Sequence, residues 1–456
     1  MTPARGAEPR GWVPPLVVLA AVGLAYANAF AGAFQFDDWN VIVGDPRVQS
    51  LAAWWQSMPG IRPLLKLTYA ANHASGLGLA GFHAVNVALH AVNALLVMAL
   101  LRRLALRHGA DAPTARFAAL AGALLFALHP VQTEAVTYLS GRSTSLAAAL
   151  ALASLLAWVA GRESGRAWLA ALVSPLLFAA GLACKEYVAV LPLALLLWWA
   201  SDPRRERGGV AAALRGSAAH WLVLLGALAA FAASDTYRRL LEASLGARGI
   251  GENLLLQAQA IVYLVGQLVR IDRLNADPLL EAGPIFGMSA PLSLAIIAAA
   301  VIGGLALLRT RPAVAFGVLW FFLWLAPTNS LLPRLDPVND RQLYVALIGP
   351  AWLVAWAVAS TRFRRAAAVA LAALMVLLVL ATAGRNAVYA DEIAFWEDVA
   401  RKSPGNARAL NNLGYAYAQA GRQDDAESAF VRALGVAPQD WRAASNLRLL
   451  REGVLP

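Results

Sequence analysis

Long apolar runs separated by short polar links make up the first 384 residues of the chain. A helix that spans a bilayer needs about 20 mainly apolar residues. Eleven runs approach or reach that length: 12–33, 82–101, 115–129, 143–160, 167–183, 187–200, 216–233, 289–308, 313–328, 342–359 and 367–383. The pattern predicts an all-α polytopic membrane domain over residues 1–384, with about eleven transmembrane helices.

One segment departs from this pattern. Residues 252–278 have helical periodicity, but they include the polar residues Gln257, Gln259 and Gln267. If this segment crossed the membrane, every later link would change sides and the arginine-rich link 360–366 would face outward. Polar backbone at membrane depth is tolerated only against protein or a water-filled cavity. We therefore expect a re-entrant or interfacial helix on the outer side.

The charges of the links predict which side of the membrane each one faces. The links predicted on the same face of the membrane as the N-terminus, counted together with Arg116, hold 17 arginines and 5 acidic residues. The segments predicted on the opposite face, before residue 385, hold 12 basic and 13 acidic residues. Arginine-rich short links are typical of cytoplasmic loops. We expect a cytoplasmic N-terminus and an extracytoplasmic C-terminal tail. The first run, preceded by Arg5 and Arg10, has no obvious cleavage site, which predicts a retained helix.

Composition supports the membrane interpretation and excludes other classes. The chain is 59% hydrophobic and 14% charged, whereas soluble domains are about half apolar and a quarter charged. The net charge of +11 lies in the short links and not on a soluble face, so we expect no nucleic-acid partner. The single cysteine, Cys184, excludes an internal disulfide framework and a multi-cysteine zinc site.

The tail, residues 385–456, has a different pattern. Residues 407–440 form one 34-residue unit with the spacing of a tetratricopeptide repeat, in which small residues let two helices approach and aromatic residues fill the space between them. Its key positions are Leu413, Gly414, Tyr417, Gly421, Ala426, Phe430, Ala433 and Pro438. Partial copies flank it. Because such repeats are usually stable in sets of three or more, we expect these helices to pack on each other or on the membrane domain.

Adjacent carboxylates follow the first apolar run, in the stretch FQFDDW. On an extended segment Asp37 and Asp38 would point in opposite directions. One interpretation is a solvated turn that caps the next element. The other is a general base or electrostatic anchor at the outer membrane surface, where Phe36 and Trp39 would desolvate a carboxylate and raise its pKa.

Further candidates lie in the other segments predicted on the outer side. Loop 127–145 gathers His129, Glu134 and Arg142, for which a helix cap, a pocket wall and a weak metal site are the alternatives. Lys185 and Glu186 occupy a short turn, as a local ion pair or as a functional site in which the lysine meets a phosphate. The remaining candidates are Arg62, Lys66, Arg341 and Tyr344.

Taken in order, these motifs resemble the transmembrane and tetratricopeptide repeat-containing O-mannosyltransferases, which are membrane glycosyltransferases of the GT-C class. The stretches are FQFDDWNVIVGDP, LHPVQTEAVTYLSGRSTSLA, CKEYVAVLP, RQLYVAL and the repeat. The resemblance implies a polyprenyl-phosphate-linked sugar donor and a protein hydroxyl acceptor. It implies that Asp37 or Asp38 is the base. It also implies that the pocket motifs of the family are matched here by His129, Glu134, Arg142, Lys185, Glu186, Arg341 and Tyr344. The arginine and alanine bias favours a bacterial inner-membrane protein with an undecaprenyl donor lipid.

The sequence therefore predicts an inverting glycosyltransferase that moves a sugar, for which mannose is one candidate, from a polyprenyl-phosphate carrier to a hydroxyl on the extracytoplasmic face. Arg142, Lys185 or Arg341 would hold the phosphate. No P-loop, dinucleotide fingerprint or serine-hydrolase elbow is present. No cofactor is required by any motif, and two adjacent carboxylates permit a divalent cation without demanding one. The alternatives are a noncatalytic membrane scaffold that recruits a partner through its repeats, and a polysaccharide polymerase or ligase with a glycan acceptor.

Overall fold

The computed structural model describes residues 12–58, 60–204, 209–280, 283–329 and 331–455. The predicted cytoplasmic segment with Arg5 and Arg10 lies outside these residues. The described residues contain helices and an isolated bridge between Ile285 and Met288, but no strand. The all-α prediction is confirmed.

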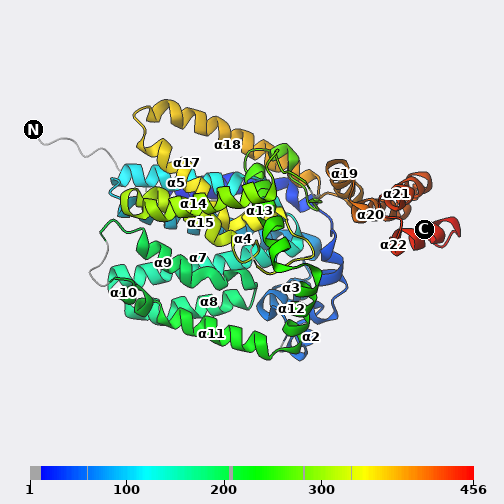
Figure 1. Cartoon of the computed structure of the whole chain (residues 1–456), viewed down its shortest axis with the longest axis horizontal. Coiled ribbons are helices and arrows are strands. Elements are labelled where there is room, and N and C mark those ends of the chain that lie inside the picture. The colour runs from blue at the N-terminus through cyan, green and yellow to red at the C-terminus, as the bar shows by residue number, and fades with distance from the viewer. Residues whose placement is uncertain (1–11, 59, 205–208, 281–282, 330, 456) are drawn as a thin grey trace, which may run out of the picture.

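Most of the chain forms a bundle of elongated helices (Figure 1). Every predicted apolar run coincides with a bundle helix, since apolar side chains and internally satisfied backbone groups favour helices in a bilayer. The bundle helices are α1 (Val13–Ala25), α4 (Gly78–Arg107), α5 (Ala112–Leu128), α7 (Arg142–Ser164), α8 (Ser174–Leu182), α9 (Leu191–Ala200), α11 (Ala218–Ala233), α14 (Ala290–Thr310), α15 (Pro312–Leu325), α17 (Ile348–Ser360) and α18 (Arg364–Ala387).

The number of membrane spans depends on how bent helices are counted. Five described helices are long and apolar enough to cross a bilayer, and three bent pairs bring the number to eight if each pair is one span. Three shorter apolar helices, Leu169–Leu182, Glu186–Ala200 and Pro312–Leu325, also coincide with predicted spans. The described helices thus fit an integral membrane protein, and the total of eleven stays a prediction.

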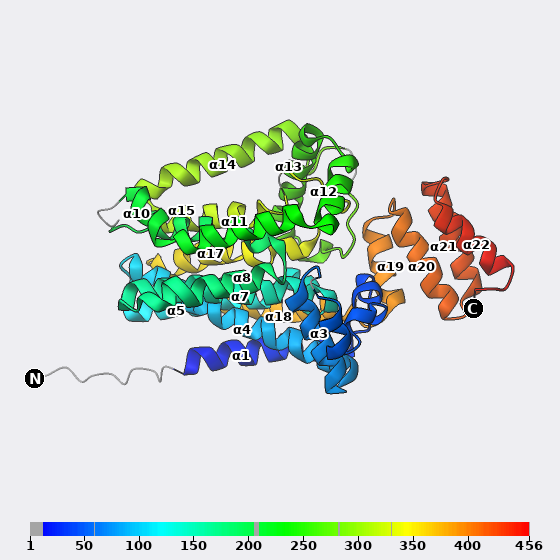
Figure 2. The ribbon, with the colours of Figure 1, turned by 90° about the horizontal axis from the view of Figure 1, so that it is seen from below.

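Short helices lie at the two ends of the bundle. Helix α10 (Gly209–Gly216) lies at the end where α1 begins, whereas α2 (Leu51–Gln56), α3 (Pro63–Ser75) and α12 (Asp235–Ala247) lie at the opposite end, the one from which the tail projects (Figure 1 and Figure 2). The connections include α6 (Thr133–Val136), α16 (Leu343–Ala346), η1 (Ala27–Ala31), η2 (Trp39–Val43), η3 (Pro46–Val48), η4 (Pro130–Gln132), η5 (Leu139–Gly141), η6 (Leu169–Val173), η7 (Glu186–Val190), η8 (Ile271–Arg273) and η9 (Asp340–Gln342). The candidate residues of the loops therefore gather at the tail end.

The glutamine-containing segment forms a helix only in its first part. Helix α13 spans Ile250–Gln267, and the described residues 268–280 and 283–289 that follow contain only the short helix η8. Gln257 is buried, and its Oε1 accepts a hydrogen bond from Asn329 Nδ2 at 2.8 Å. The polar face of α13 thus packs against protein, as the sequence argument required, while its position relative to a membrane stays a prediction.

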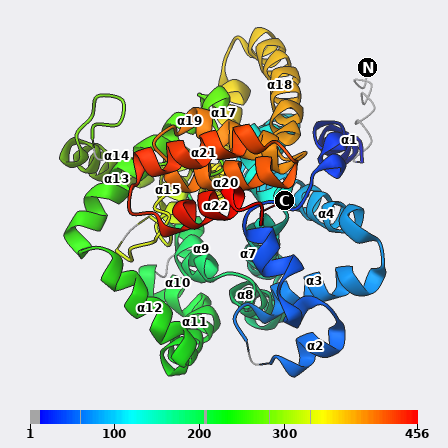
Figure 3. The same ribbon diagram turned by 90° about the vertical axis from the view of Figure 1, so that its right-hand side faces the viewer.

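The tail forms four helices that project from one end of the bundle (Figure 2) and lie in front of only part of that end in Figure 3. They are α19 (Glu392–Lys402), α20 (Ala407–Gln419), α21 (Gln423–Val436) and α22 (Trp441–Arg451). Buried Phe395, Trp396 and Leu410 of the tail share an apolar cluster with Tyr138 of the membrane domain. The tail therefore packs on the membrane domain as well as on itself. Its assignment as a tetratricopeptide-repeat domain with a boundary near residue 385 stays a prediction.

Candidate functional site

The acidic pair begins a helical turn and is not extended, so that expectation is wrong. Phe36 has a left-handed backbone with φ 45°, and residues 37 and 38 enter the first turn before η2. A non-glycine residue in this region is strained and is frequently found at functional sites. The turn still sends the two carboxylates in different directions, because neighbouring side chains of a helix point about 100° apart.

Asp38 is fully buried, and both of its carboxylate oxygens accept hydrogen bonds from backbone N–H groups. Its Oδ1 accepts the Ser140 N–H at 2.7 Å and its Oδ2 accepts the Gln35 N–H at 3.0 Å. Burial raises the pKa of Asp38 to about 7, although the two N–H donors act in the opposite direction. This carboxyl joins the first loop to the 130–142 loop, and it has no free face for a substrate.

Asp37, in contrast, is accessible and faces a guanidinium. Its side chain is 42% exposed and its Oδ2 lies 4.0 Å from Arg341 Nη2. Tyr138 fixes the turn, since its hydroxyl accepts the Asp37 N–H at 2.9 Å. Glu134 completes the group: its Oε2 accepts the Arg341 N–H at 3.0 Å, and its Oε1 lies 3.6 Å from Arg341 Nε. Three segments far apart in the sequence thus place a half-exposed carboxylate beside an arginine.

Further cations surround this arginine. Arg62, which also has a left-handed backbone with φ 52°, binds Glu186 through Nη2 at 2.7 Å, so Glu186 pairs with Arg62 and not with its neighbour Lys185. Lys185 Nζ instead donates to Thr144 Oγ1 at 2.6 Å and Ser143 Oγ at 3.2 Å. Burial lowers the pKa of Lys185, and the charges of Arg341, Arg62 and Arg334 lower it further.

Two of these cations lack an acidic partner. In the part of the chain that the structure describes, no carboxylate lies within ion-pair distance of Lys185 or Arg334. Burial and the nearby Arg341 lower the pKa of Arg334 to about 10. Cations that repel each other away from bulk water are costly unless an anion joins them. The group formed by Arg62, Lys185, Arg334 and Arg341, called here the cation cluster, is therefore suited to an anionic ligand.

Three other sequence candidates do not reach this site. His129 Nδ1 accepts the Val131 N–H and its Nε2 bonds Leu268 O at 3.1 Å, which is the capping role among the alternatives above. Tyr344 is buried in the bundle, where its hydroxyl contacts His90 Nδ1 at 2.8 Å. Arg142 is fully buried and donates to Asn86 Oδ1 at 2.7 Å, Asn72 Oδ1 at 2.6 Å and Phe82 O at 3.0 Å.

The phosphate-binding role predicted for Arg142 is therefore wrong. Its guanidinium is fully engaged by protein acceptors and cannot also hold a donor phosphate. Lys66 is likewise occupied, 3.4 Å from Asp45 Oδ2. The remaining candidates near Arg341 are Asp37, Glu134, Lys185, Glu186 and Arg62.

Sequence reasoning missed a polar stripe on α4. His83, Asn86, His90 and Asn93 recur every three or four residues, and all four are fully buried. Asn86 Nδ2 donates to Val136 O at 3.1 Å, and Asn93 Nδ2 donates to Ser145 O at 2.8 Å, so the stripe fixes the 130–142 loop and α7. The signal was present, since polar residues at helical spacing within an apolar run mark an inward face.

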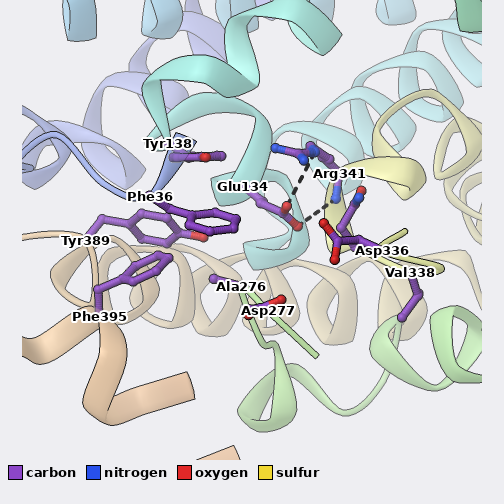
Figure 4. Close-up of a pocket in the computed structure, with 11 residues that line it drawn as sticks. Phe36, Glu134, Tyr138, Ala276, Asp277, Asp336, Val338, Arg341, Tyr389 and Phe395 are labelled. Atoms are coloured by element: carbon purple, nitrogen blue, oxygen red, sulfur yellow. Dashed lines mark hydrogen bonds and ion pairs between the residues drawn. The ribbon is translucent and has the colours of Figure 1, made fainter. Parts of the chain in front are cut away.

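A small pocket lies between Arg341 and the tail (Figure 4). Glu134 and Arg341 lie in its wall, with four aromatic side chains on one side and Asp336 on the other. The aromatic residues are Phe36, Tyr138, Tyr389 and Phe395. Gly141 permits the fold of the adjacent loop, because a Cβ there would lie 2.3 Å from Glu134 O. Among the described residues, no group of three or more His, Cys, Asp or Glu is arranged to hold a metal ion.

Comparison with known proteins gives relatives for part of the chain. A Drosophila melanogaster protein named protein O-mannosyl-transferase Tmtc2 is 34% identical over 183 residues, which cover 35% of this chain and 19% of that protein. Protein O-mannosyl-transferase TMTC4 of Mus musculus is 32% identical over 209 residues, or 38% of this chain and 28% of the relative. The matches thus span about a fifth of the first relative and somewhat more than a quarter of the second. No family model and no solved structure matches the chain.

Proposed function

We propose that this chain, a relative of the TMTC protein O-mannosyl-transferases, is a membrane glycosyltransferase that moves a sugar from a polyprenyl-phosphate carrier to a hydroxyl of a protein acceptor. The observation that supports this most directly is the cation cluster beside the half-exposed Asp37 at one end of an apolar bundle. Mannose is the first sugar to test, because the names of the relatives specify it.

The cation cluster supplies the site for the donor phosphate. Among the described residues, no carboxylate pairs with Lys185 or Arg334, and Arg341 lies between these cations and the Asp37 carboxylate. An ionised phosphate between these cations would remove their mutual repulsion and form charge-assisted hydrogen bonds. The isoprenoid chain would then lie against the apolar flanks of the bundle, so the headgroup and the cluster meet at the membrane surface.

Asp37 is the proposed general base and Asp38 is its structural support. The acceptor hydroxyl oxygen would attack C1 of the sugar while Asp37 takes the hydroxyl proton. A new C1–O bond forms as the bond from C1 to the phosphate oxygen breaks, and polyprenyl phosphate leaves with the bonding electron pair. The cations stabilise the charge that develops on the leaving phosphate. Direct displacement inverts the configuration at C1 and needs no covalent enzyme intermediate.

The orientation of the site is part of the proposal. The links at the α10 end are the arginine-rich ones, which supports a cytoplasmic position for that end. The catalytic loops and the tail lie at the other end (Figure 2), which we assign to the extracytoplasmic face. A cysteine introduced at exposed Gln419, in a Cys184→Ala background, should react with a membrane-impermeant maleimide in intact cells. A cysteine that reacts only after lysis would refute this orientation.

A transfer assay tests the function. Full-length protein in lipid nanodiscs is incubated with undecaprenyl phosphate linked to radiolabelled mannose and with Ser- and Thr-containing peptides, and products are identified by mass spectrometry. We expect hydroxyl-linked mannose with wild-type protein. Asp37→Asn should lower the rate by about 100-fold or more, the usual range for losing a general base. Undiminished transfer by the Asp37→Asn/Asp38→Asn double variant would overturn the catalytic assignment, and a glycan product would favour a polymerase.

A further inference from the structure

A wide pocket lies between the first turns of α5, the link that follows α17 and the first turns of α18. From this end of the bundle α18 runs to the end from which the tail projects (Figure 1). The volume of the pocket is about 700 Å³, and its polar and aromatic lining residues are Arg362, Arg364, Arg365, Phe117 and Phe363. At about 30 Å³ per water molecule it has room for roughly twenty waters. This pocket, called here the arginine pocket, is therefore large enough for a lipid headgroup.

The positive charge of the arginine pocket is not neutralised by the protein. In the part of the chain that the structure describes, no carboxylate lies within ion-pair distance of Arg362, Arg364 or Arg365. Asp111, the N-terminal cap of α5, senses the charge of Arg364 but lies beyond that distance. Arg107 at the same end of the bundle, in contrast, pairs with an acid, Asp202. Three cations beside one pocket thus leave a place for an anion.

Aromatic rings, and not acids, contact two of these guanidinium groups. Arg362 Cζ lies 4.7 Å from the ring centre of Phe363, and Arg364 Cζ lies 4.9 Å from the ring centre of Phe117. Arg364 Nη1 also donates to Thr114 Oγ1 at 3.1 Å. A guanidinium has five N–H donors, and stacking on a ring face leaves them in place to bind phosphate oxygens. The arginines are therefore held in position with donors to spare.

The arginine pocket continues into an apolar surface of α18. Val369, Val376 and Leu380 are 72%, 62% and 66% exposed, and they follow Arg365 at helical spacing, so all four share one side of the helix. Because α18 is long and apolar enough to cross a bilayer, this side would contact acyl chains. Phe363 is exposed beside the pocket, and aromatic residues are typical of the boundary between headgroups and acyl chains. A cationic pocket joined to such a surface favours a phospholipid over a free phosphate ion.

We infer that the arginine pocket binds the headgroup of an anionic phospholipid, with Arg362, Arg364 and Arg365 on the phosphate and the exposed side of α18 against the acyl chains. Basic pockets beside membrane helices bind anionic headgroups in this way, and guanidinium groups form charge-assisted hydrogen bonds with phosphate. The site is distinct from the cation cluster, which lies at the tail end of the bundle. It does not depend on the proposed glycosyltransferase activity.

Lipid titration of the full-length protein in detergent tests this inference. Phosphatidylglycerol, which is anionic, and phosphatidylcholine, which is zwitterionic, are titrated separately, and native mass spectrometry gives the two dissociation constants. Wild type should prefer phosphatidylglycerol on the order of 100-fold, because each of three basic residues near an anionic headgroup contributes about fivefold. The Arg362→Gln/Arg364→Gln/Arg365→Gln variant should lose most of this preference, and its affinity for phosphatidylcholine should stay the same.

Matched variants separate the pocket from net charge and from folding. Replacing the same three arginines by lysine keeps the charge and should keep most of the preference. The Arg102→Gln/Arg309→Gln/Arg311→Gln variant removes three exposed arginines of the same end from outside the pocket, and it should bind as wild type does. Unfolding temperatures are measured in the same detergent. If the triple pocket variant unfolds early, the exposed single variant Arg365→Gln should still show a loss of about fivefold.

Three results would overturn the inference. Equal affinity of wild type for the two lipids would remove the site. An equal loss of preference in the Arg102, Arg309 and Arg311 variant would assign the effect to net charge. If soluble glycerol 1-phosphate binds wild type as tightly as phosphatidylglycerol does, the pocket binds phosphate esters in general and the lipid assignment is wrong. The mannose-transfer assay is independent of all three, so this inference and the proposed function can fail separately.

Discussion

Isosteric substitution of each member of the acidic pair separates catalysis from folding. Asp38→Asn replaces one acceptor oxygen by an amide that faces a backbone N–H, either of Gln35 or of Ser140. Leaving one buried N–H unpaired costs about 1–3 kcal/mol. Asp37→Asn removes only a half-exposed ion pair with a separation of 4.0 Å, and such pairs contribute about 0–1 kcal/mol. We therefore expect Asp38→Asn to lower stability and Asp37→Asn to leave it nearly unchanged.

Activity should show the opposite order. Both variants are assayed for mannose transfer, and their unfolding temperatures are measured in the same detergent. Asp37→Asn should lose about 100-fold or more in rate at an unchanged unfolding temperature. Asp38→Asn should unfold at a lower temperature but retain most of the rate per folded molecule. If Asp38→Asn keeps the wild-type unfolding temperature and loses the activity, the assignment of base and support is wrong.

Stability against pH should also report on Asp38. Burial raises the pKa of Asp38 to about 7 in the folded protein, so the folded state binds more protons than the unfolded state from about pH 4 to 7. The stabilising contribution of this group is therefore lost as the pH rises through that interval. Asp38→Asn should flatten that part of the curve of stability against pH, and an unchanged curve would contradict a raised pKa. Lys185→Gln should raise the Michaelis constant of the donor with little effect on unfolding. Because the pKa of Lys185 is lowered, wild-type donor affinity should weaken as rising pH removes its proton, and a Lys185→Arg variant that keeps the same loss would count against this lysine. Arg142→Met should destabilise the fold by about 1–3 kcal/mol, because the buried acceptors Asn86 Oδ1, Asn72 Oδ1 and Phe82 O lose their donor; a variant with normal stability but impaired donor binding would return Arg142 to the phosphate site. Gly414→Val should destabilise the tail by about 1–3 kcal/mol, because a Cβ at residue 414 would lie 2.7 Å from the Phe430 ring; unchanged limited proteolysis of the tail would refute that packing argument.

In the tail, the spacing of residues predicted the packing of two helices but not the partners of their exposed side chains. The positions of Gly414, Ala426 and Phe430 predicted two closely packed helices, and α20 and α21 pack with Gly414 against Phe430 and with Ala426 buried. The same pattern could not predict that Arg408 would cross to Asp277 and Asp336, because periodicity specifies which residues share a helix face and does not specify the partner.

The amino-acid sequence by itself determined the helical class, the apolar runs and the split of charges between the two ends, because hydrophobicity and backbone satisfaction act locally along the chain. It also located the acidic pair and most of the cations. Only the tertiary structure decided which residues meet. Asp37 faces Arg341 and Asp38 is buried because the 130–142 loop supplies Ser140 and Tyr138 to that turn. Arg142 and Tyr344 are buried in the bundle, where they form hydrogen bonds with polar side chains of α4. The packed helices bring these partners together, and buried polar groups require such partners.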